Sequence, residues 1–473
     1  MNVLLTGSTG YIGRRLKQNL LKDENINLRL FVRNKKSVSS SVINKVEIVQ
    51  GDTFNKNALK EALKGIDTAF YLIHSLNDKN YKDLDRISAQ NFVDIASECG
   101  VKRIVYLGGL GVKNKHISKH LLSRIETGEV LSSNSNIQTI WIRAGVIIGS
   151  GSASFEIIRN LVEKIPVIFT PKWVYTIAQP IAINDVLSYL QKALYLDETK
   201  NLIVDIGSKQ LSYKDMMLKT AKVSGLKRYI IPLPFMSINI SSYWLNIFTP
   251  VPFGMAKALI QGLQSEVVMQ NDNAKKYFSQ IKPISYEEAV GHALKEIEQN
   301  QVISRWNDNG GKVWDEVHSK EFSDAVFVDR KQRDISNIDH SKVYESFTSL
   351  GGVNGWFDFD VLWKLRGFID KLIGGVGLKR GRRSQCDLRT GDCLDFWKVV
   401  DLKKDERILL YAQMKLPGKA WLEFKIKDEK LIQSAYFYPK GAWGRIYWYI
   451  LIPFHYFVFK NMIEGVIKKI KVK

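Results

Sequence analysis

Short apolar runs alternate with stretches of helical spacing through the first 150 residues of the chain. The apolar runs predict strands at Asn2–Thr6, Leu28–Arg33, Val46–Gln50, Thr68–Ile73, Arg103–Leu107 and Gln138–Arg143. The intervening stretches predict helices at Tyr11–Leu21, Asn57–Leu63 and Asp83–Cys99. Strands that alternate with helices in this way are typical of a parallel sheet covered on both faces. The pattern therefore predicts an α/β domain with a Rossmann-type, doubly wound parallel sheet.

The pattern becomes less regular beyond residue 150. A strand is expected at Ile203–Ile206 and a helix at Tyr213–Ser224, whereas Pro232–Phe253 is rich in proline and aromatic residues. The stretch Gln299–Lys320 is polar and contains Asn309-Gly310-Gly311, which is typical of a linker. We therefore expect a first domain over residues 1–300, a linker over 301–320 and a second domain over 321–473.

The order of predicted elements after the linker differs from that of the first half. A strand at Phe322–Val328 precedes two helices, four short strands and a last helix. Their expected ranges are Ser341–Leu350, Phe359–Ile373, Cys393–Val400, Arg407–Met414, Ala420–Ile426, Leu431–Tyr438 and Trp443–Lys471. Strands that follow one another through short turns form antiparallel sheets, so this order predicts a separate α+β domain.

A glycine-rich turn, Gly7-Ser8-Thr9-Gly10-Tyr11-Ile12-Gly13, lies between the first predicted strand and the first predicted helix. Gly7 permits a tight turn, Gly10 lets a pyrophosphate approach the backbone, and Gly13 allows close packing of helix and strand. The phosphates would then meet free N–H groups at the positive end of the helix. The motif predicts a dinucleotide site built from Thr6 through Gly13. A structural turn without a ligand is the alternative interpretation.

The end of the second predicted strand bears on the choice of cofactor. Arg33 stands where an acidic residue would favour NAD(H), and an arginine can pair with a 2′-phosphate instead. The sequence thus favours NADP(H) over NAD(H), with a solvated basic turn as the alternative. Asp52 follows the third strand, where an adenine contact is expected. Leu72 and His74 follow the fourth strand, at the sheet edge where ligands bind.

Several of these segments together resemble a known superfamily. The Gly-x-x-Gly-x-x-Gly spacing, Gly51-Asp52 and the stretches at residues 71–75 (YLIHS) and 106–111 (YLGGLG) resemble the extended and atypical short-chain dehydrogenase/reductases, especially the NmrA-like branch. Residues 143–152 (RAGVIIGSGS) and 179–182 (QPIA) are similar to a bacterial subgroup of NAD(P)H-binding proteins with a C-terminal domain of unknown function. The resemblance covers essentially the whole chain.

The resemblance also implies where a catalytic residue would stand. Members of the superfamily use a Tyr-x-x-x-Lys pair on the helix after the fifth strand, and a serine just after that strand. This chain carries Ser118-Lys119-His120-Leu121-Leu122-Ser123-Arg124 and Gly108-Gly109 at these places.

His120 and Arg124 are four residues apart and share a helical face. A histidine can transfer a proton near neutral pH, and an arginine can bind a ribose or a phosphate. One interpretation is that His120 and Arg124 replace the Tyr and Lys. The other is a degenerate site that binds a cofactor without turnover. His74 is a second catalytic candidate.

The second domain resembles the START-like, polyketide-cyclase-like helix-grip fold, which implies an apolar cavity. Its aromatic residues serve either as ordinary core or as the lining of a pocket for a hydrophobic small molecule: Trp356, Phe357, Trp363, Phe396, Trp397, Trp421, Phe424, Tyr436 and Tyr438. The apolar stretch Ile446–Phe459 is shorter than the roughly 20 residues of a membrane span. We expect a helix buried against the sheet. An interfacial membrane helix, with Trp448 and Tyr449 ahead of a lysine-rich tail, is the alternative.

Composition limits the remaining possibilities. The chain has 45% hydrophobic and 25% charged residues and a formal net charge of +21, which fits a folded protein with a basic surface. The basic residues are scattered and no nucleic-acid motif is present, so nucleic acid is not an expected partner. The three cysteines, Cys99, Cys386 and Cys393, are too sparse for a disulfide framework or a zinc site. No metal is expected. No signal peptide is recognised, and the expected location is cytoplasmic, with membrane association as the alternative.

These observations favour an atypical NADP(H)-dependent reductase that acts on a hydrophobic small molecule held by, or delivered from, the C-terminal domain. The missing Tyr-x-x-x-Lys pair leaves open whether the protein is an enzyme. A non-catalytic NADP(H)-binding sensor or assembly protein is the first alternative. A membrane-surface lipid-handling protein is the second.

Overall fold

The computed structural model describes residues 1–38, 40–74, 81–113, 117–233, 262, 265–299, 301–306, 325–356, 360–372, 375, 377, 381–384 and 387–471. The chain divides into two compact units, Met1–Trp306 and Asn307–Lys473. Each unit has its own sheet and its own hydrophobic core, so the two are described separately.

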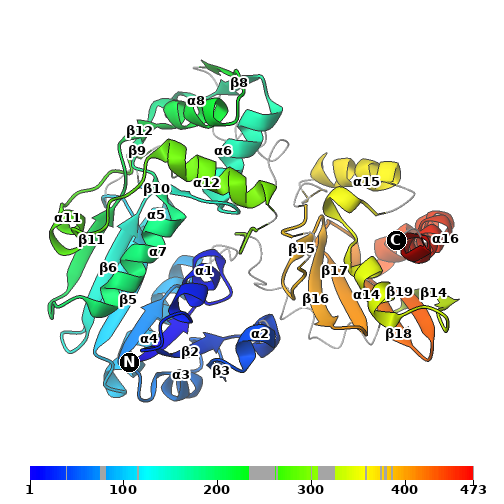
Figure 1. Cartoon of the computed structure of the whole chain (residues 1–473), viewed down its shortest axis with the longest axis horizontal. Helices are drawn as coiled ribbons and strands as arrows, with labels where there is room; N and C mark the ends of the chain where they lie inside the picture. Colours follow the sequence, from blue (N-terminus) through cyan, green and yellow to red (C-terminus); the bar gives the residue numbers. More distant parts are fainter. Residues whose placement is uncertain are drawn as a thin grey trace. The chain divides into compact units, whose positions relative to one another are not determined.

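The first unit is built on a parallel sheet of seven strands in the order β3-β2-β1-β4-β5-β6-β11 (Figure 1). The strands are β1 (Asn2–Thr6), β2 (Asn27–Val32), β3 (Glu47–Gln50), β4 (Thr68–Tyr71), β5 (Arg103–Gly109), β6 (Gln138–Ala144) and β11 (Leu202–Ile206). The order reverses between β1 and β4, which is the arrangement of a Rossmann-type fold. The predicted parallel α/β sheet is confirmed, and strand ends differ from the expected ones by at most two residues.

Helices cover both faces of this sheet. Helices α1 (Tyr11–Leu20) and α7 (Ile183–Lys192) pack on one face, and α3 (Lys56–Leu63), α4 (Tyr81–Glu98) and α5 (Lys119–Leu131) pack on the other. Along β1, Val3 and Leu5 point into the first core and Leu4 into the second. Because side chains alternate along a strand, a sheet buried on both faces requires continuous apolar strands, as the sequence has. Short elements complete this layer: η1 (Lys35–Ser37), α2 (Ser40–Ile43), η3 (Ala193–Tyr195) and α11 (Asn273–Tyr277).

A third core lies beside the sheet within the same unit. It is formed by α6 (Ala153–Lys164), α8 (Tyr213–Val223) and α12 (Tyr286–Glu298). Three small strand pairs and one turn border it: β7 (Ile147–Ile148) with β10 (Ile181–Ala182), β8 (Val167–Thr170) with β13 (Tyr229–Pro232), β9 (Ile177–Ala178) with β12 (Leu211–Ser212), and η2 (Lys172–Tyr175). Most of the proline- and aromatic-rich stretch Pro232–Phe253 lies outside the described residues.

The first unit continues past residue 300, where we expected it to end. Val302 and Ser304 are buried, and the Trp306 N–H donates to the Gly151 carbonyl at 2.8 Å. The Ser304 hydroxyl donates to the Tyr11 carbonyl at 2.9 Å. Residues 301–306 are thus part of the fold of the first unit and not a linker. Residues 307–320 of the expected linker lie outside the described part.

The second unit is built on an antiparallel sheet of six strands in the order β14-β19-β18-β17-β16-β15. The strands are β14 (Phe327–Asp334), β15 (Cys393–Leu394), β16 (Trp397–Lys403), β17 (Arg407–Ala412), β18 (Gly418–Lys427) and β19 (Lys430–Pro439). The helical elements are α14 (His340–Thr348), η5 (Gly352–Asn354), α15 (Asp360–Leu372) and α16 (Gly441–Lys471). A separate antiparallel domain after the parallel one is confirmed.

Two strand predictions in this unit were wrong in detail. The single strand expected over Cys393–Val400 is two strands, because Asp395 adopts φ 55° and turns the chain between β15 and β16. The strand expected at Phe322–Val328 is β14, which runs to Asp334 and pairs with β19 along its whole length. Its second half (DRKQRD) is polar because β14 is an edge strand, and an edge strand needs little apolar surface.

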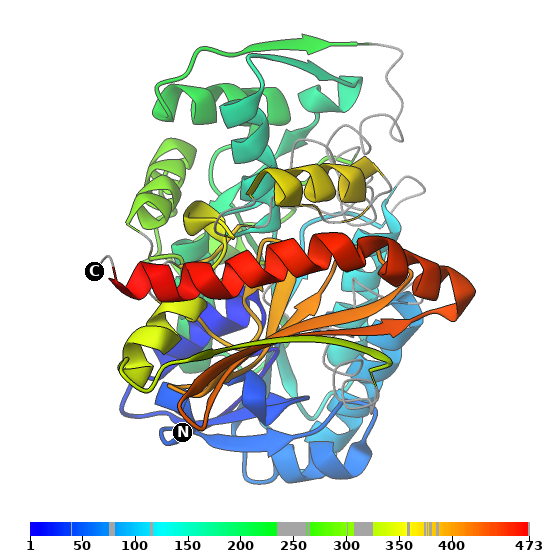
Figure 2. The same ribbon diagram turned by 90° about the vertical axis from the view of Figure 1, so that its right-hand side faces the viewer.

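Helix α16 runs across the sheet of the second unit (Figure 2), and only part of it is buried. In its C-terminal half, Met462, Ile463 and Val466 pack with α14 and the sheet. In its N-terminal half, Ile450 is 63% and Phe457 60% exposed. Our expectation that Ile446–Phe459 is buried against the sheet was therefore wrong for most of that stretch. The sheet contacts only one narrow face of the N-terminal half of α16, around Trp448.

Most of the aromatic residues singled out in the second domain lie in its core. The ring centroids of Trp356 and Phe396 are 6.1 Å apart, and those of Phe396 and Trp397 are 5.4 Å apart. Trp421 and Phe424 are buried, whereas Tyr438 is partly exposed and Phe357 lies outside the described residues. Trp356, Phe396 and Trp397 thus pack against one another as core residues do, whereas Trp421 lies in a separate buried cluster with Tyr411.

Candidate active site

The glycine loop forms the tight turn that the motif predicts, between β1 and α1. Gly7 has φ +66°, and a Cβ there would lie 2.4 Å from the Leu72 carbonyl oxygen. A Cβ at Gly13 would lie 2.2 Å from the Gly7 carbonyl oxygen. No larger residue fits at either position without moving the backbone, so both glycines are required by the turn itself.

Gly10 has a different environment, and it is the position that faces open space. A Cβ on Gly10 would meet a single atom within 4 Å among the described residues, the Gly7 carbonyl oxygen at 3.3 Å. The Ser8 hydroxyl nearby is buried and has no hydrogen-bond partner within the described part of the chain. A buried hydroxyl without a partner costs free energy unless a ligand or water satisfies it. An open loop with an unsatisfied donor at the start of α1 fits a dinucleotide phosphate.

Other side chains of the loop point away from the open side of Gly10. The Thr6 hydroxyl donates to the Phe70 carbonyl at 2.9 Å and accepts from Leu72 N–H at 3.1 Å, so it ties β1 to β4. The Tyr11 hydroxyl is buried, and burial raises its pKa. Ile12 and Leu72 pack on the core. Cofactor contacts by these residues would therefore involve their backbone or apolar surface.

Arg14 is a basic residue of this site that the sequence analysis missed. It follows Gly13, is almost fully buried, and its Nε donates to the Thr9 carbonyl at 2.8 Å. This contact holds the guanidinium against the loop. The available signal was its position immediately after the glycine motif, in a helix turn that faces the expected phosphates.

The residues expected at the adenosine end lie at the carboxyl ends of β2 and β3. Arg33 is the first residue after β2 and is exposed. Asp52 follows β3, and its Oδ1 accepts from the Phe54 N–H at 3.1 Å, which fixes the turn. Gly51 packs so closely that a Cβ there would lie 2.5 Å from Ala58 Cβ. Within the described part, the Arg33 side chain makes no hydrogen bond or ion pair. The Asp52 side chain, in contrast, stabilises the local turn.

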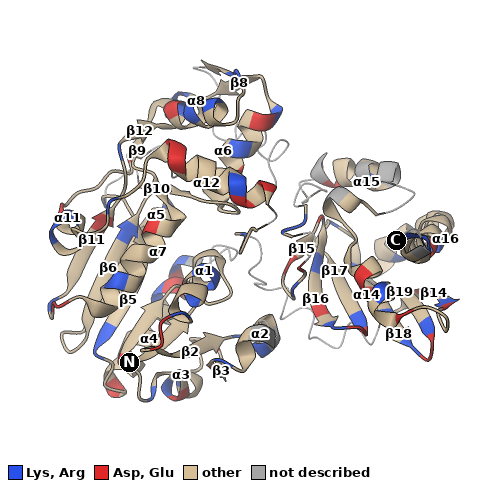
Figure 3. Ribbon diagram, viewed as in Figure 1, with Lys and Arg blue, Asp and Glu red and all other residues tan. Residues whose placement is uncertain are grey.

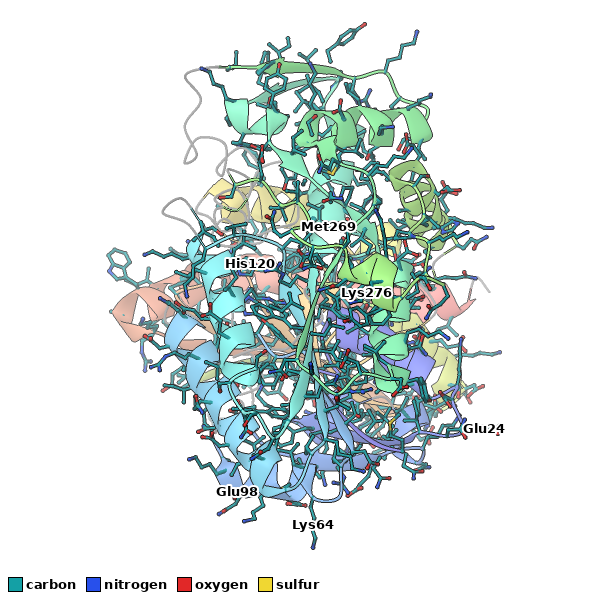
Figure 4. The ribbon with its side chains drawn as sticks, turned by 90° about the vertical axis from the view of Figure 1, so that its left-hand side faces the viewer. Glu24, Lys64, Glu98, His120, Met269 and Lys276 are labelled. Carbon is teal, nitrogen blue, oxygen red and sulfur yellow. The ribbon has the colours of Figure 1, made fainter. Side chains whose placement is uncertain are left out.

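His74 and His120, which come from distant parts of the sequence, are brought together by the fold. His120 lies in the first turn of α5 (Figure 4), and His74 lies just after β4. His74 Nε2 and His120 Nδ1 are 3.1 Å apart, and His74 Nδ1 is 2.7 Å from Asp85 Oδ2 on α4. Asp85 also accepts from the Ser123 hydroxyl at 3.1 Å. Asp85, His74 and His120 thus form one hydrogen-bonded chain at the carboxyl edge of the sheet.

Both histidines are neutral at neutral pH. Burial lowers the pKa of His120 to about 3, with further lowering by His74 and the Arg124 guanidinium. Burial also lowers the pKa of His74, although its hydrogen bond to Asp85 acts in the opposite direction. A neutral imidazole has one N–H donor and one bare nitrogen, so the chain has a definite direction.

The hydrogen bonds assign the tautomers. A carboxylate is an acceptor, so His74 donates through Nδ1–H to Asp85 and its Nε2 is bare. His120 must then donate through Nδ1–H to His74, which leaves His120 Nε2 as a bare acceptor. His120 keeps partial exposure, and it makes no other hydrogen bond within the described part. In this state His120 Nε2 can accept a proton.

Arg124, the expected partner of His120, contacts the end of β5. Its guanidinium donates to the Leu107 carbonyl and lies over the Tyr106 ring, with Cζ 5.6 Å from the centroid. It acts on the two histidines through its charge, which lowers the pKa of both. Whether it also contacts a ribose or phosphate stays a prediction.

Trp141 explains why no serine follows β5. A Cβ on Gly108 would lie 2.3 Å from Trp141 Nε1, and one on Gly128 of α5 would lie 2.3 Å from Trp141 Cε2. The indole of Trp141 on β6 fills the space between β5 and α5. The superfamily's serine position is therefore closed at Gly108 by packing.

Asp85 and Ser123 are further residues of the site that the sequence analysis missed. Asp85, Ser88, Ala89, Phe92 and Val93 are buried and follow helical spacing along α4. Buried carboxylates are rare unless they are paired, so an aspartate on the apolar face of an amphipathic helix was a usable signal. Ser123 has the same character on α5.

Two further features of the described residues bear on the site, namely possible metal ligands and the distribution of basic residues. Among them, no group of three or more His, Cys, Asp or Glu side chains has a geometry that would hold a metal ion. Basic side chains are spread over the elements of both units (Figure 3).

Comparison with protein families separates the chain into the same two parts. Residues 7–145 match a family described as NAD(P)H-binding. Residues 322–462 match a family described as a protein of unknown function (DUF2867). The first match contains the glycine loop, His74, Asp85 and all of α5. The second match covers most of the second unit.

One curated relative is a reductase. The (4-alkanoyl-5-oxo-2,5-dihydrofuran-3-yl)methyl phosphate reductase of Streptomyces griseus is 25% identical over 171 residues, which is 35% of this chain. The chain spans 57% of the length of that relative.

Solved structures resemble the fold of the first unit. A triphenylmethane reductase from a Citrobacter species is 22% identical with a TM-score of 0.52, and the alignment covers 62% of this chain and all of that one. The same reductase in complex with NADP(H) gives 21% identity and a TM-score of 0.51 over 62% of this chain and 99% of that one. A nucleoside-diphosphate-sugar epimerase from Staphylococcus aureus is 18% identical with a TM-score of 0.51, over 62% and 100%.

The fold, the glycine loop and the family match lead to the same conclusion for the first part of the chain. The strand order is that of a dinucleotide-binding sheet, and the matched residues include the whole of Gly7–Gly13. The first unit contains an NAD(P)H-binding domain of the Rossmann type, with a reductase and an epimerase among its structural neighbours.

Proposed function

We propose that this protein is an NADP(H)-dependent oxidoreductase in which the chain Asp85–His74–His120 transfers the proton. The observation that carries the proposal is this hydrogen-bonded chain, with links of 2.7 and 3.1 Å, at the edge of the sheet. His74, the middle residue of this hydrogen-bonded chain, lies two residues after Leu72, and the Leu72 carbonyl lies close to Gly7 of the glycine loop. The bound nicotinamide cofactor would supply or accept the hydride.

The proton that leaves the substrate can be taken up by His120, His74 and Asp85 together. When a substrate hydroxyl gives a proton to His120 Nε2, the proton on His120 Nδ1 passes to His74 Nε2. The proton on His74 Nδ1 then passes to Asp85. The chain gains one proton in total, and the reverse sequence returns one proton to the substrate during reduction. Asp85 and His74 would hold the His120 ring and carry the proton behind it, and His120 would be the group that touches the substrate.

NADP(H) is the proposed cofactor in preference to NAD(H). Arg33 is exposed directly after β2, and Arg14 is held against the phosphate loop by its bond to Thr9. Arginine pairs with phosphate through charge-assisted hydrogen bonds, so Arg33 favours the cofactor that carries a 2′-phosphate, and Arg14 favours the pyrophosphate of either cofactor. An NmrA-like assignment of the domain is part of this proposal.

The proposed substrate is a hydrophobic small molecule. The second unit combines an antiparallel sheet with a long C-terminal helix that crosses it, and this combination supports the proposal of a START-like helix-grip domain. We propose that this unit holds or delivers the substrate. The resemblance of folds is an analogy, so the chemistry of the substrate must be found by assay.

NADPH oxidation with a panel of apolar carbonyl compounds tests the proposal. With an active compound, His120→Ala should lose 10²–10⁴-fold in rate and keep its NADPH affinity, because a general acid or base is removed. Asp85→Asn should lower the rate less and shift its pH profile. His292→Ala replaces an exposed histidine on α12 and should leave the rate unchanged.

Two results would refute this assignment. Full turnover by His120→Ala would remove His120 from the mechanism. NADPH binding without oxidation across the whole panel would favour the alternative, a non-catalytic NADP(H)-binding sensor or assembly protein.

A further inference from the structure

The N-terminal half of α16 exposes a continuous apolar surface. Its exposed large side chains are Trp443, Ile446, Tyr449, Ile450, Ile452, Phe454, Tyr456 and Phe457, with exposed fractions between 46% and 78%. Isolated exposed apolar residues are normal, but eight of them along one half-helix are not. Among the described residues, α16 is also the one helix long and apolar enough to cross a membrane, with a mean hydropathy of 1.3.

The opposite face of this half-helix is fixed on the protein. Gly444, Trp448 and Phe459 are buried and follow helical spacing. The Trp448 ring stacks on Phe327 of β14 and Phe437 of β19, with centroids 5.3 and 5.5 Å apart. The N-terminal half of α16 therefore packs on the sheet along a narrow strip, and the stacked Trp448 ring fixes its position. The apolar surface is a fixed feature of the folded unit.

Helix α15 adds apolar residues next to this surface. The Arg366 guanidinium of α15 acts to lower the pKa of the Tyr447 hydroxyl of α16, so these two side chains are neighbours. Leu365, Phe368 and Ile369 of α15 are 54%, 60% and 44% exposed. We call the eight residues of α16 and these three residues of α15 the apolar platform.

Basic side chains lie at the rim of the apolar platform. Lys331 Nζ is 5.2 Å and Lys460 Nζ 6.0 Å from the Tyr456 ring centroid, and Arg445 Cζ is 6.0 Å from that of Phe327. Asp329 is the acidic residue beside this rim, and it is paired with Lys331. Basic residues around an apolar surface match the lipid headgroups and acyl chains of an anionic bilayer. Trp443, Tyr449 and Tyr456 are residue types that favour the same interface.

We propose that the apolar platform inserts into the surface of an anionic lipid bilayer. The helix would lie in the interface and not cross it, for two reasons. The exposed stretch Trp443–Phe457 is about 15 residues, or roughly 22 Å, whereas a span needs about 30 Å. The C-terminal half of α16 is committed to the core through Met462 and Val466. The proposal does not depend on the reaction assigned to the first unit.

Flotation of the full-length protein with vesicles tests this proposal. The protein should float with vesicles of phosphatidylcholine and phosphatidylglycerol and much less with phosphatidylcholine alone. The triple variant Ile450→Glu/Phe454→Glu/Phe457→Glu should lose at least roughly 100-fold in vesicle affinity. Arg445→Ala/Lys460→Ala should lose roughly 30-fold, from about a factor of five for each basic residue at an anionic surface.

A matched variant controls for the added negative charge. Phe54→Glu/Val112→Glu/Tyr229→Glu changes exposed apolar residues of the first unit and should float like the unchanged protein. Because all these positions are exposed, each variant should keep its thermal unfolding temperature. Equal flotation of the α16 triple variant, or an equal loss in the control, would overturn the proposal. So would a lipid-free dimer that the α16 variant dissociates, since the platform would then be an interface between two copies.

Discussion

His120 and His74 stay uncharged mainly because burial disfavours the charged form of each imidazole. The pKa of each is lowered first by burial and then by the Arg124 guanidinium, and Asp85 offsets only part of this. A buried polar group is tolerated when it is hydrogen-bonded, and the chain to Asp85 provides those bonds. The same environment that orders the chain therefore makes it sensitive to acid.

Acid should destabilise the protein through His120. Its folded-state pKa of about 3 lies below the ordinary value of 6.5, so between these values the unfolded chain binds more protons. Stability from this group is present above pH 6.5 and is lost as the pH falls toward 3. Between pH 7 and pH 5 the loss is about 2 kcal/mol.

Urea unfolding at pH 7 and pH 5 measures this effect. The unchanged protein should lose about 2 kcal/mol more than His120→Gln, which lacks the titrating group. An identical pH dependence in both proteins would show that His120 titrates normally in the folded state.

The exposed Arg33 should determine which cofactor binds more tightly. Arg33→Ala should weaken NADPH by about 10–150-fold, the value of one charge-assisted contact, and should change NADH little. Dissociation constants for both cofactors, measured by fluorescence titration, give the ratio directly. Equal losses for NADPH and NADH would remove the case for the 2′-phosphate contact.

The sequence could identify His74 and His120 but not their contact. His74 was a candidate because it follows the fourth strand, and His120 because it lies on the helix after the fifth strand, four residues before Arg124. Their partner Asp85 lies on another helix, and its role depends on how α4 packs beside β4 and α5. Contacts between side chains on different elements leave only weak signals in a single sequence.

At the scale of elements, the packing of β5, β6 and α5 decides what chemistry the site can hold. The Trp141 indole lies against both Gly108 of β5 and Gly128 of α5. A large ring at this layer requires glycine on both neighbours. The same packing excludes a side chain at Gly108, one of the two positions where the resemblance places a serine.

Restoring that serine should therefore destabilise the fold. Gly108→Ser puts an atom within 2.3 Å of Trp141 Nε1 and should cost about 1–3 kcal/mol, as overpacking does. Gly111→Ser is the matched control, because a Cβ there meets only ordinary contacts at 3.7 Å. Urea unfolding of the two variants compares them. If Gly108→Ser is as stable as Gly111→Ser, Trp141 does not close this position.

The strands of the first unit could be predicted and those of the second only partly. A strand buried on both faces, such as β1 or β5, is continuously apolar and easy to recognise. Edge strand β14 has a polar second half, and the break at Asp395 depends on a positive φ that apolar patterning does not reveal. The exposed half of α16 misled prediction because apolar residues normally indicate burial.

At the scale of the whole molecule, residues that follow α12, the last helix of the first unit, pack back on the start of that unit. Arg15 of α1 is buried and contacts Ser304, Ser150 and Glu296 of α12. These contacts join the two ends of the unit, which are 289 residues apart in sequence for Arg15 and Ser304. The segment 301–306 therefore stabilises the helix that carries the phosphate loop.

Fragments that end on either side of this segment should differ in stability. Met1–Trp306 keeps Val302 and Ser304 and should fold and bind NADPH. Met1–Gln299 leaves the buried Arg15 without Ser304 and should be less stable by about 1–3 kcal/mol. Thermal unfolding and NADPH titration of both fragments measure this difference. Equal stability would place the boundary at residue 300, as the sequence analysis expected.

The direct test of the central claim is NADPH binding by the full-length protein and by Gly10→Val, measured by isothermal titration calorimetry. The account predicts saturable binding by the unchanged protein. Gly10→Val should fold, since its Cβ meets only one atom at 3.3 Å, and should lose the cofactor because the side chain fills the loop. Gly291→Val on α12, where a Cβ meets nothing within 4 Å, should bind normally. Undiminished NADPH affinity in a folded Gly10→Val variant would contradict the account.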